Sequence, residues 1–184
     1  MRARMNVSTD NDAVILVDAE DVEIGTAGKL DAHRRGLRHR AISVLVRNAE
    51  GALLLQRRAA GKYHSSGLWA NACCSHPLPG ENTLDAARRR LAQEMGFDCA
   101  LEPLFKTHYR ADVSNGLIED EVVHVFGGTF DGPVKPDPAE ASEWKWIALA
   151  ELKNDMRARP QDYAVWFRHY LAHHGELIAQ WLAR

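Results

Sequence analysis

The spacing of apolar residues along the chain predicts strands that alternate with helices. Short apolar runs bounded by turn residues are typical of strands, and such runs occupy residues 13–17, 41–57, 104–110, 117–130 and 144–147. The run at 41–57 has the turn signal Asn-Ala-Glu-Gly in its middle, so it is expected to form a hairpin. The polar, glycine-containing residues 21–36 are expected to be mostly loop, with room for a short helix.

The clearest helix lies between residues 82 and 96. Asn82 or Thr83 can cap its start, because a short polar side chain accepts a hydrogen bond from a first-turn N–H. Gly96 can end it in the left-handed conformation. One apolar stripe at helical spacing is formed by Leu84, Ala87, Leu91 and Met95. Further helices are expected at 148–156 and 162–182, so the fold class is α/β, a mixed sheet with flanking helices.

Composition indicates one soluble globular domain. The chain has 184 residues, 46% of them hydrophobic and 26% charged, with a net charge of −2. The balanced charge gives no expectation of a nucleic-acid partner, and no apolar run approaches the ~20 residues of a membrane helix. Three cysteines, two of them adjacent, make no disulfide framework, and a cytoplasmic location is expected. Residues 1–12 are expected to be disordered and 13–184 to form the domain.

Charged residues on the predicted helix lie off its apolar stripe. By themselves Arg88, Arg89, Arg90 and Glu94 are typical of a solvated face. Together with their neighbours they resemble the Nudix box, Gly-x5-Glu-x7-Arg-Glu-apolar-x-Glu-Glu-x-Gly-apolar, which holds metal and diphosphate. The chain reads Ser75-x5-Glu81-x7-Arg89-Arg90-Leu91-Ala92-Gln93-Glu94-Met95-Gly96-Phe97.

Two departures from the Nudix box have a chemical meaning. Arg90 and Gln93 stand where carboxylates are usual. A hydrolase of this family needs clustered carboxylates to hold divalent cations and activate water. The helix is therefore expected to bind diphosphate better than it cleaves it.

A second resemblance is more specific. The segment from Trp69 to Pro77 is similar to the W-x-N-x-x-C-x-H-P motif of type I isopentenyl-diphosphate isomerases, a branch of the Nudix superfamily. Tyr109-Arg110 and the run Glu119-Asp120-Glu121-Val122 resemble that family's second motif. The resemblance implies a Nudix-like α/β/α sandwich with a core at about 39–173. It also implies interconversion of isopentenyl and dimethylallyl diphosphate in isoprenoid biosynthesis by a cytoplasmic monomer or weak dimer.

The resemblance also implies a metal site. Glu119 and Glu121 are two residues apart on a predicted strand, so both carboxylates point to one face. By themselves they are more often an exposed strand face, and any one histidine is more often a hydrogen-bonded or surface residue. The family's ligand positions fall on these two residues and on His33, His39 and His76. Mixed N/O ligands suit Mg²⁺, Mn²⁺ or Zn²⁺, with Mn²⁺ favoured. The His33–His39 spacing is one residue shorter than in similar members of the family.

Basic residues match the family's diphosphate site. Lys29, Arg58, Lys62 and Arg90 stand at its phosphate-binding positions, and Glu94 would hold a Mg²⁺ that bridges to the same oxygens. Arginine binds phosphate oxygens in a bidentate manner and lysine acts as a point charge. Without the motifs each would be interpreted as an ordinary surface charge.

The isomerisation needs an acid and a base in a dry pocket, because a proton is added to an alkene and another is removed from a neighbouring carbon. The resemblance assigns Cys74 and Glu121 to these roles, in either order, and Tyr109 to assist the carboxylate. Trp166 would face a tertiary carbocation, and Trp69 is expected to line the same pocket. Two other functions stay open with less weight, a Nudix hydrolase of a nucleoside or prenyl diphosphate and a non-catalytic module with a structural metal.

Overall fold

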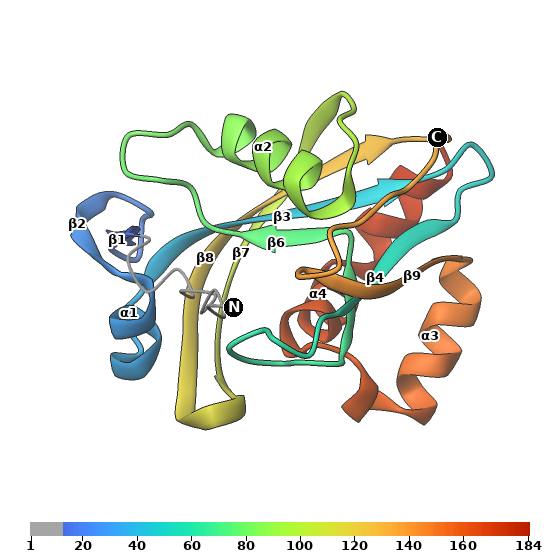
Figure 1. The fold of residues 1–184 in the computed structure, drawn as a ribbon. Coiled ribbons are helices and arrows are strands. Elements are labelled where there is room, and N and C mark those ends of the chain that lie inside the picture. The colour runs from blue at the N-terminus through green and yellow to red at the C-terminus, as the bar shows by residue number, and fades with distance from the viewer. Residues whose placement is uncertain (1–12) are drawn as a thin grey trace, which may run out of the picture.

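The structure is a computed structural model that describes residues 13–184, and it has helices on both faces of one mixed sheet (Figure 1). The strands are β1 (Ala13–Val17), β2 (Glu23–Gly28), β3 (His39–Arg47), β4 (Leu53–Arg58), β5 (Trp69–Asn71), β6 (Cys73–Ser75), β7 (Leu101–Val113), β8 (Leu117–Thr129) and β9 (Ala141–Ile147). The helices are α1 (Lys29–Arg35), α2 (Thr83–Met95), α3 (Leu149–Ala158) and α4 (Val165–Leu182), with short 3-10 turns at Ser114–Gly116 and Pro160–Asp162. The predicted disorder of residues 1–12 lies outside the described residues.

The sheet is built around β3. This strand runs parallel to β8 along its whole length, and β8 forms a long antiparallel hairpin with β7. On its other edge β3 pairs with β1, β6 and β4 in turn. Strand β9 closes the far side of the sheet by pairing with β4. Parallel and antiparallel neighbours in one sheet confirm the α/β class.

Two apolar cores lie on opposite faces of the sheet. In β3, Ile42 and Val44 pack with the stripe of α2, whereas Ala41 and Leu45 pack against α3 and α4. This alternation follows from the two-residue period of a strand buried on both faces. None of the helices in residues 13–184 is long and apolar enough to cross a membrane.

The predicted hairpin at 41–57 is wrong beyond its turn. Strands β3 and β4 pair only at Arg47 and Leu53, next to the turn, and then separate. The segment 69–75 fills the gap, because β5 pairs with β4 and β6 pairs with β3. This insertion could not be predicted from the sequence, since two three-residue strands are too short to show an alternation of apolar and polar residues. The consequence is functional, because the gap brings the Cys-x-His segment into the middle of the sheet.

The loop expected at 21–36 is also wrong in part. Residues 23–28 form β2, which pairs with β1 at the edge of the sheet and keeps side chains such as Ile24 exposed. Its polar composition is that of an edge strand with one solvated face. The short helix is α1, which ends at Gly36 in the left-handed conformation.

Helix α2 confirms the predicted start and end. The Asn82 side chain accepts a hydrogen bond of 2.8 Å from the backbone N–H of Leu84, and Gly96 has a φ of 76°. Glu94 is only 2% exposed, so it does not belong to a solvated face of the helix. Arg88, by contrast, is exposed and pairs with Asp98 at 2.6 Å. Helix α4 begins at Val165 and not at residue 162, because the 3-10 turn ends at Asp162 and Tyr163 then forms a β-bridge with Trp69.

Gly96, directly after α2, should tolerate no side chain. An added Cβ would lie 2.2 Å from the backbone oxygen of Lys135, which cannot move freely. Gly80 has nearly the same φ, 77°, with nothing within 4 Å of an added Cβ. We expect Gly80→Ala to lower the free energy of unfolding by about 1 kcal/mol and Gly96→Ala by more than about 3 kcal/mol. Urea unfolding measures both, and equal losses would contradict the clash.

Candidate active site

A single pocket gathers most of the residues predicted from the sequence. Its lining includes ten of them, namely Lys29, Arg58, Lys62, Cys74, His76, Arg90, Tyr109, Glu119, Glu121 and Trp166. The remaining predicted residues, His33, His39 and Glu94, are buried behind this lining. Trp69 does not line the pocket. The ammonium of Lys145 instead covers its ring at 4.6 Å, so that expectation is wrong.

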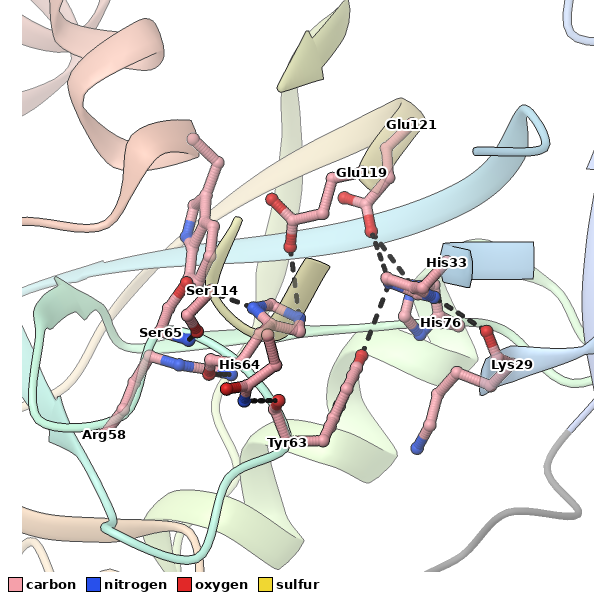
Figure 2. Close-up of polar contacts among 12 residues, drawn as sticks. Lys29, His33, Arg58, Tyr63, His64, Ser65, His76, Ser114, Glu119 and Glu121 are labelled. Carbon is pink, nitrogen blue, oxygen red and sulfur yellow. Dashed lines mark hydrogen bonds and ion pairs between the residues drawn. The ribbon is translucent and has the colours of Figure 1, made fainter. Parts of the chain in front are cut away.

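Strand register places the histidines and carboxylates together. His39, the first residue of β3, is the direct partner of Glu121 in the parallel pair, and Tyr109 is the antiparallel partner of the same glutamate. His76 follows β6, and His33 comes from α1. Residues from four separate parts of the chain therefore meet at one end of the central strands (Figure 2).

Four of these residues form a group with the geometry of a metal site. The donor atoms of His33, His39, His76 and Glu121 all lie within 4.8 Å of one another. The Nε2 atoms of His39 and His76 are 3.2 Å apart, and they lie 3.3 Å and 3.0 Å from Oε1 of Glu121. Adjacent corners of an octahedron with bonds of about 2.1 Å are about 3 Å apart. These three atoms thus match one face of such a polyhedron.

Outer contacts prepare the imidazoles for a cation. Nδ1 of His33 contacts the backbone oxygen of Lys29 at 2.8 Å, and Nδ1 of His39 contacts the backbone oxygen of Leu37 at 2.8 Å. A carbonyl accepts only from a protonated nitrogen, so Nε2 is the nitrogen of each imidazole that faces the group and that carries the lone pair when the ring is neutral. The tight turn at Gly36 lets His33 reach the group despite its short spacing from His39, and their ring centroids are 4.8 Å apart.

Glu119 faces a partner that the sequence did not suggest. Its Oε1 lies 3.3 Å from Nε2 of His64, and together with His33 these two residues form a second group of possible metal donors. The Tyr109 hydroxyl lies 2.9 Å from Oε2 of Glu119 and 2.8 Å from Oε2 of Glu121, and its single proton can be donated to either carboxylate. The phenol therefore ties both carboxylates together. His64 lies in a loop whose sequence gives no periodic signal, so only the fold could place it here.

The loop that carries His64 is held from the tip of the β7–β8 hairpin. The hydroxyl of Ser114 accepts from the backbone N–H of Ser65 at 2.8 Å, and the Asn115 amide donates to the backbone oxygen of Tyr63 at 2.8 Å. Ser65 has a φ of 52°, which is uncommon for a residue with a side chain. Figure 2 shows Tyr63 and His64 closing over the metal-donor group.

Burial and charge set the protonation of the group. Burial raises the pKa of Glu119 well above its usual value, and the charge of Glu121 adds to this effect. Burial acts in the same direction on Glu121, but hydrogen bonds from His39 and His76 outweigh it and hold that pKa well below its usual value. Burial also lowers the pKa of His76 to about 4. A neutral imidazole beside an ionised carboxylate is a suitable donor set for a divalent cation.

Cationic side chains form part of the pocket lining. Lys62 and Arg90 both pair with Glu140, and Nη2 of Arg90 also donates to Oε1 of Glu94 at 2.8 Å. Among residues 13–184, the Nε groups of Arg58 and Arg90 are buried without a hydrogen-bond partner. Buried guanidinium N–H groups in a pocket are available to an anion. Glu140 is a residue that sequence reasoning missed, because it lies in a proline-rich loop far from the motifs.

Trp166 and Arg58 lie against each other. The guanidinium carbon of Arg58 is 5.1 Å from the centroid of the Trp166 ring, and the indole N–H donates to the amide oxygen of Asn71 at 3.3 Å. Trp166 is 2% exposed and belongs to the core on the α4 face. It is therefore both a core residue and part of the pocket wall.

Cys74 occupies a polar niche in the pocket. Its Sγ lies 3.1 Å from Oγ of Ser43 and 3.2 Å from the amide oxygen of Asn71. Burial raises the pKa of this thiol to about 12, so it holds its proton at neutral pH. Cys73 is fully buried in the α2 core and has the role of a small hydrophobic residue, as expected.

The chain is similar to families of known function. A model of the NUDIX domain matches residues 37–169. Isopentenyl-diphosphate Delta-isomerase 2 of Aromatoleum aromaticum is 56% identical over 155 residues, which are 84% of this chain and 82% of the relative. Isopentenyl-diphosphate Delta-isomerase of Burkholderia multivorans is 48% identical over 172 residues, covering 93% and 98%.

Solved structures share the fold at low sequence identity. The DR0079 protein of Deinococcus radiodurans has a TM-score of 0.67 at 19% identity, covering 79% of this chain and 89% of its own. The MutT protein of Methanosarcina mazei has a TM-score of 0.62 at 18% identity, covering 76% and 94%. At these identities the likeness concerns the fold alone.

Divalent cations should stabilise the protein through the histidine group. A ligand that binds only the native state adds about 2.7 kcal/mol to the free energy of unfolding at 100 times its Kd. We expect Mn²⁺ to raise the unfolding temperature of the wild type but not of His39→Ala, measured by scanning calorimetry. His173→Ala, at an exposed position of α4, is the matched control and should keep the full shift. An equal shift in His39→Ala would exclude this group as the binding site.

Proposed function

The chain belongs to the Nudix family and, within it, to the isopentenyl-diphosphate Delta-isomerases, and on this premise we propose how its pocket interconverts isopentenyl and dimethylallyl diphosphate, a step of isoprene biosynthesis. The observation that carries the proposal is that Cys74, Tyr109 and Glu121 line one pocket together with lysine and arginine side chains. A thiol and a carboxyl in the same pocket as several cations suit a substrate with an apolar end and an anionic end.

Cys74 and Glu121 are the two proton-transfer groups. One adds a proton to the double bond and the other removes a proton from the neighbouring carbon, through a tertiary carbocation. Each is a weak acid or base held in a water-poor site, where proton transfer between positioned groups is efficient. The phenol of Tyr109, 2.8 Å from Glu121, orients the carboxylate and stabilises its charge. The raised pKa of Cys74 keeps a proton on sulfur for delivery.

A divalent cation fits the histidine group. The ligands are the five predicted residues, namely His33, His39, His76, Glu119 and Glu121. Mg²⁺, Mn²⁺ and Zn²⁺ are the candidates, and Mn²⁺ suits the mixed nitrogen and oxygen donors best. When bound, the cation supplies positive charge that tunes the acidity of Glu121. Glu119 contacts His64 in this structure, so it would have to turn from His64 to join the other four ligands.

The diphosphate is held by Lys29, Arg58, Lys62 and Arg90. That Lys62 and Arg90 both contact the carboxylate of Glu140 supports their convergence on one anionic group. The substrate diphosphate displaces Glu140 and engages the buried Nε groups of the two arginines. Glu94, 2.8 Å from Arg90, would hold a Mg²⁺ that neutralises the charge of the diphosphate.

The indole of Trp166 faces the carbocation, a contact that contributes about 2 kcal/mol when desolvated. The partner is a small prenyl diphosphate. We also propose a cytoplasmic location and a monomeric or weakly dimeric state, both of which rest on the sequence.

Replacement of the thiol should abolish the proton transfer. In D₂O with Mg²⁺ and Mn²⁺, the wild type should convert isopentenyl diphosphate to deuterated dimethylallyl diphosphate, measured by NMR. Cys74→Ala should lower the rate by about 100-fold to 10,000-fold, the range of a lost general acid or base. Cys99→Ala, a thiol outside the pocket, is the control and should retain the wild-type rate. Release of inorganic phosphate that survives Cys74→Ala would favour a hydrolase instead.

Arg90 should contribute to substrate binding. We expect Arg90→Gln to raise KM about 10-fold to 100-fold, since a hydrogen bond to a charged group contributes about 1.5–3 kcal/mol. Arg88→Gln, two residues away on the exposed face of α2, should leave KM unchanged. Steady-state kinetics on folded protein, verified by circular dichroism, compares the two. If both variants behave alike, Arg90 is not part of the diphosphate site.

A further inference from the structure

Three side chains beside the pocket form a closed ring of hydrogen bonds. The Asn71 amide Nδ2 donates to Oγ of Ser43 at 2.8 Å, Oγ of Ser43 lies 3.1 Å from Sγ of Cys74, and the thiol donates to Oδ1 of Asn71 at 3.2 Å. Each member of the ring gives one proton and accepts one. Neither the asparagine nor the serine belongs to the proposed catalytic set.

The orientation of the Asn71 amide is determined by its surroundings. Its Nδ2 also donates to the backbone oxygens of Val44 at 2.8 Å and Cys73 at 3.1 Å. Carbonyl oxygens only accept, so the NH₂ group must face them. The amide oxygen therefore faces Cys74, and it accepts a second bond from the indole of Trp166 at 3.3 Å. The amide is buried and cannot exchange these partners for water.

The amide in turn directs the serine proton. Because Ser43 accepts from Nδ2 of Asn71, its own O–H is available to the sulfur of Cys74 and to the hydroxyl of Tyr170, which also lies beside it. Ser43 and Cys74 are also direct cross-strand partners in the β3–β6 pair, so the backbone fixes their separation. Ser43 is fully buried, which makes this orientation persistent.

We propose that Ser43 and Asn71 are positioning residues that fix the sulfur of Cys74, and the direction of its proton, for the isomerisation. The proposal rests on the role of Cys74 in the proposed function. In the ring the thiol proton points to Oδ1 of Asn71 and the sulfur is held by Ser43, so a rotation about the Cβ–Sγ bond alone turns the proton to the substrate. Without the ring, the thiol would occupy several rotamers.

The decisive variant is Ser43→Ala, which removes the hydroxyl and leaves the bonds from Asn71 to two backbone carbonyls intact. We expect kcat to fall about 10-fold to 100-fold, the effect of a misplaced reacting group. KM should stay within about 2-fold of the wild-type value, because Ser43 does not contact the residues proposed to bind the diphosphate. Asn71→Ala is a less useful variant, since it leaves two buried carbonyls without a hydrogen-bond donor and is expected to destabilise the fold.

A control variant in the core distinguishes an effect on the position of the thiol from an effect on the stability of the fold. Val46→Ala, further along β3, removes buried apolar atoms of the α2 core at a residue that makes no hydrogen bond to the ring. It should lower the unfolding temperature more than Ser43→Ala does and leave kcat of the folded fraction near that of the wild type. If kcat falls in proportion to the unfolding temperature in both variants, Ser43 is a structural residue only.

A double-mutant cycle tests whether Ser43 acts through Cys74. In a Cys74→Ala background, Ser43→Ala should have no further effect on the residual deuterium exchange into substrate, because residues that act as a unit are not additive. An additional 10-fold loss there would overturn the proposal. If Cys74→Ala itself retains full turnover, the proposed function of the thiol fails. If Cys74→Ala is inactive and Ser43→Ala is fully active, only the ring proposal fails.

Discussion

Parallel pairing between β3 and β8 joins two distant parts of the chain along nine consecutive residue pairs. His39 meets Glu121 at the first of these pairs, and the antiparallel pairing of β7 then adds Tyr109 to the same position. A slip of one residue would turn every side chain of a strand to the other face. The two apolar cores oppose such a slip, since both faces of β3 are buried in different side chains. Hydrophobic packing thus determines the geometry of the polar site.

The polar site imposes a cost that the two cores must outweigh. His33, His39, His64, Glu119 and Glu121 are all nearly removed from water. Burial of charged groups is unfavourable unless they are paired or coordinate a metal. The pKa of Glu119 is raised and that of Glu121 is lowered, because only one of two adjacent carboxylates easily holds a negative charge. A site of this kind is suited to chemistry and gives little stability of its own.

Local sequence signals predicted the parts of the fold that repeat regularly. Helix α2 was bounded correctly because its cap at Asn82 and its end at Gly96 are determined by adjacent residues. The two carboxylates on one strand face followed from the two-residue period. The insertion of β5 and β6 between β3 and β4 was missed, because pairing between distant strands leaves no mark in a three-residue segment. His64 and Glu140 were missed for the same reason, since only the closed fold brings their loops to the pocket.

The tip of the β7–β8 hairpin has a consequence for how this chain can change in length. Exposed hairpin tips usually accept insertions and deletions, because little depends on their conformation. Here Ser114 and Asn115 hold the loop of Tyr63 and His64 by two hydrogen bonds. One extra residue at the tip would shift both partners and leave the loop without its anchor. The length of this turn is therefore fixed by the pocket, although no residue of the turn is part of the pocket.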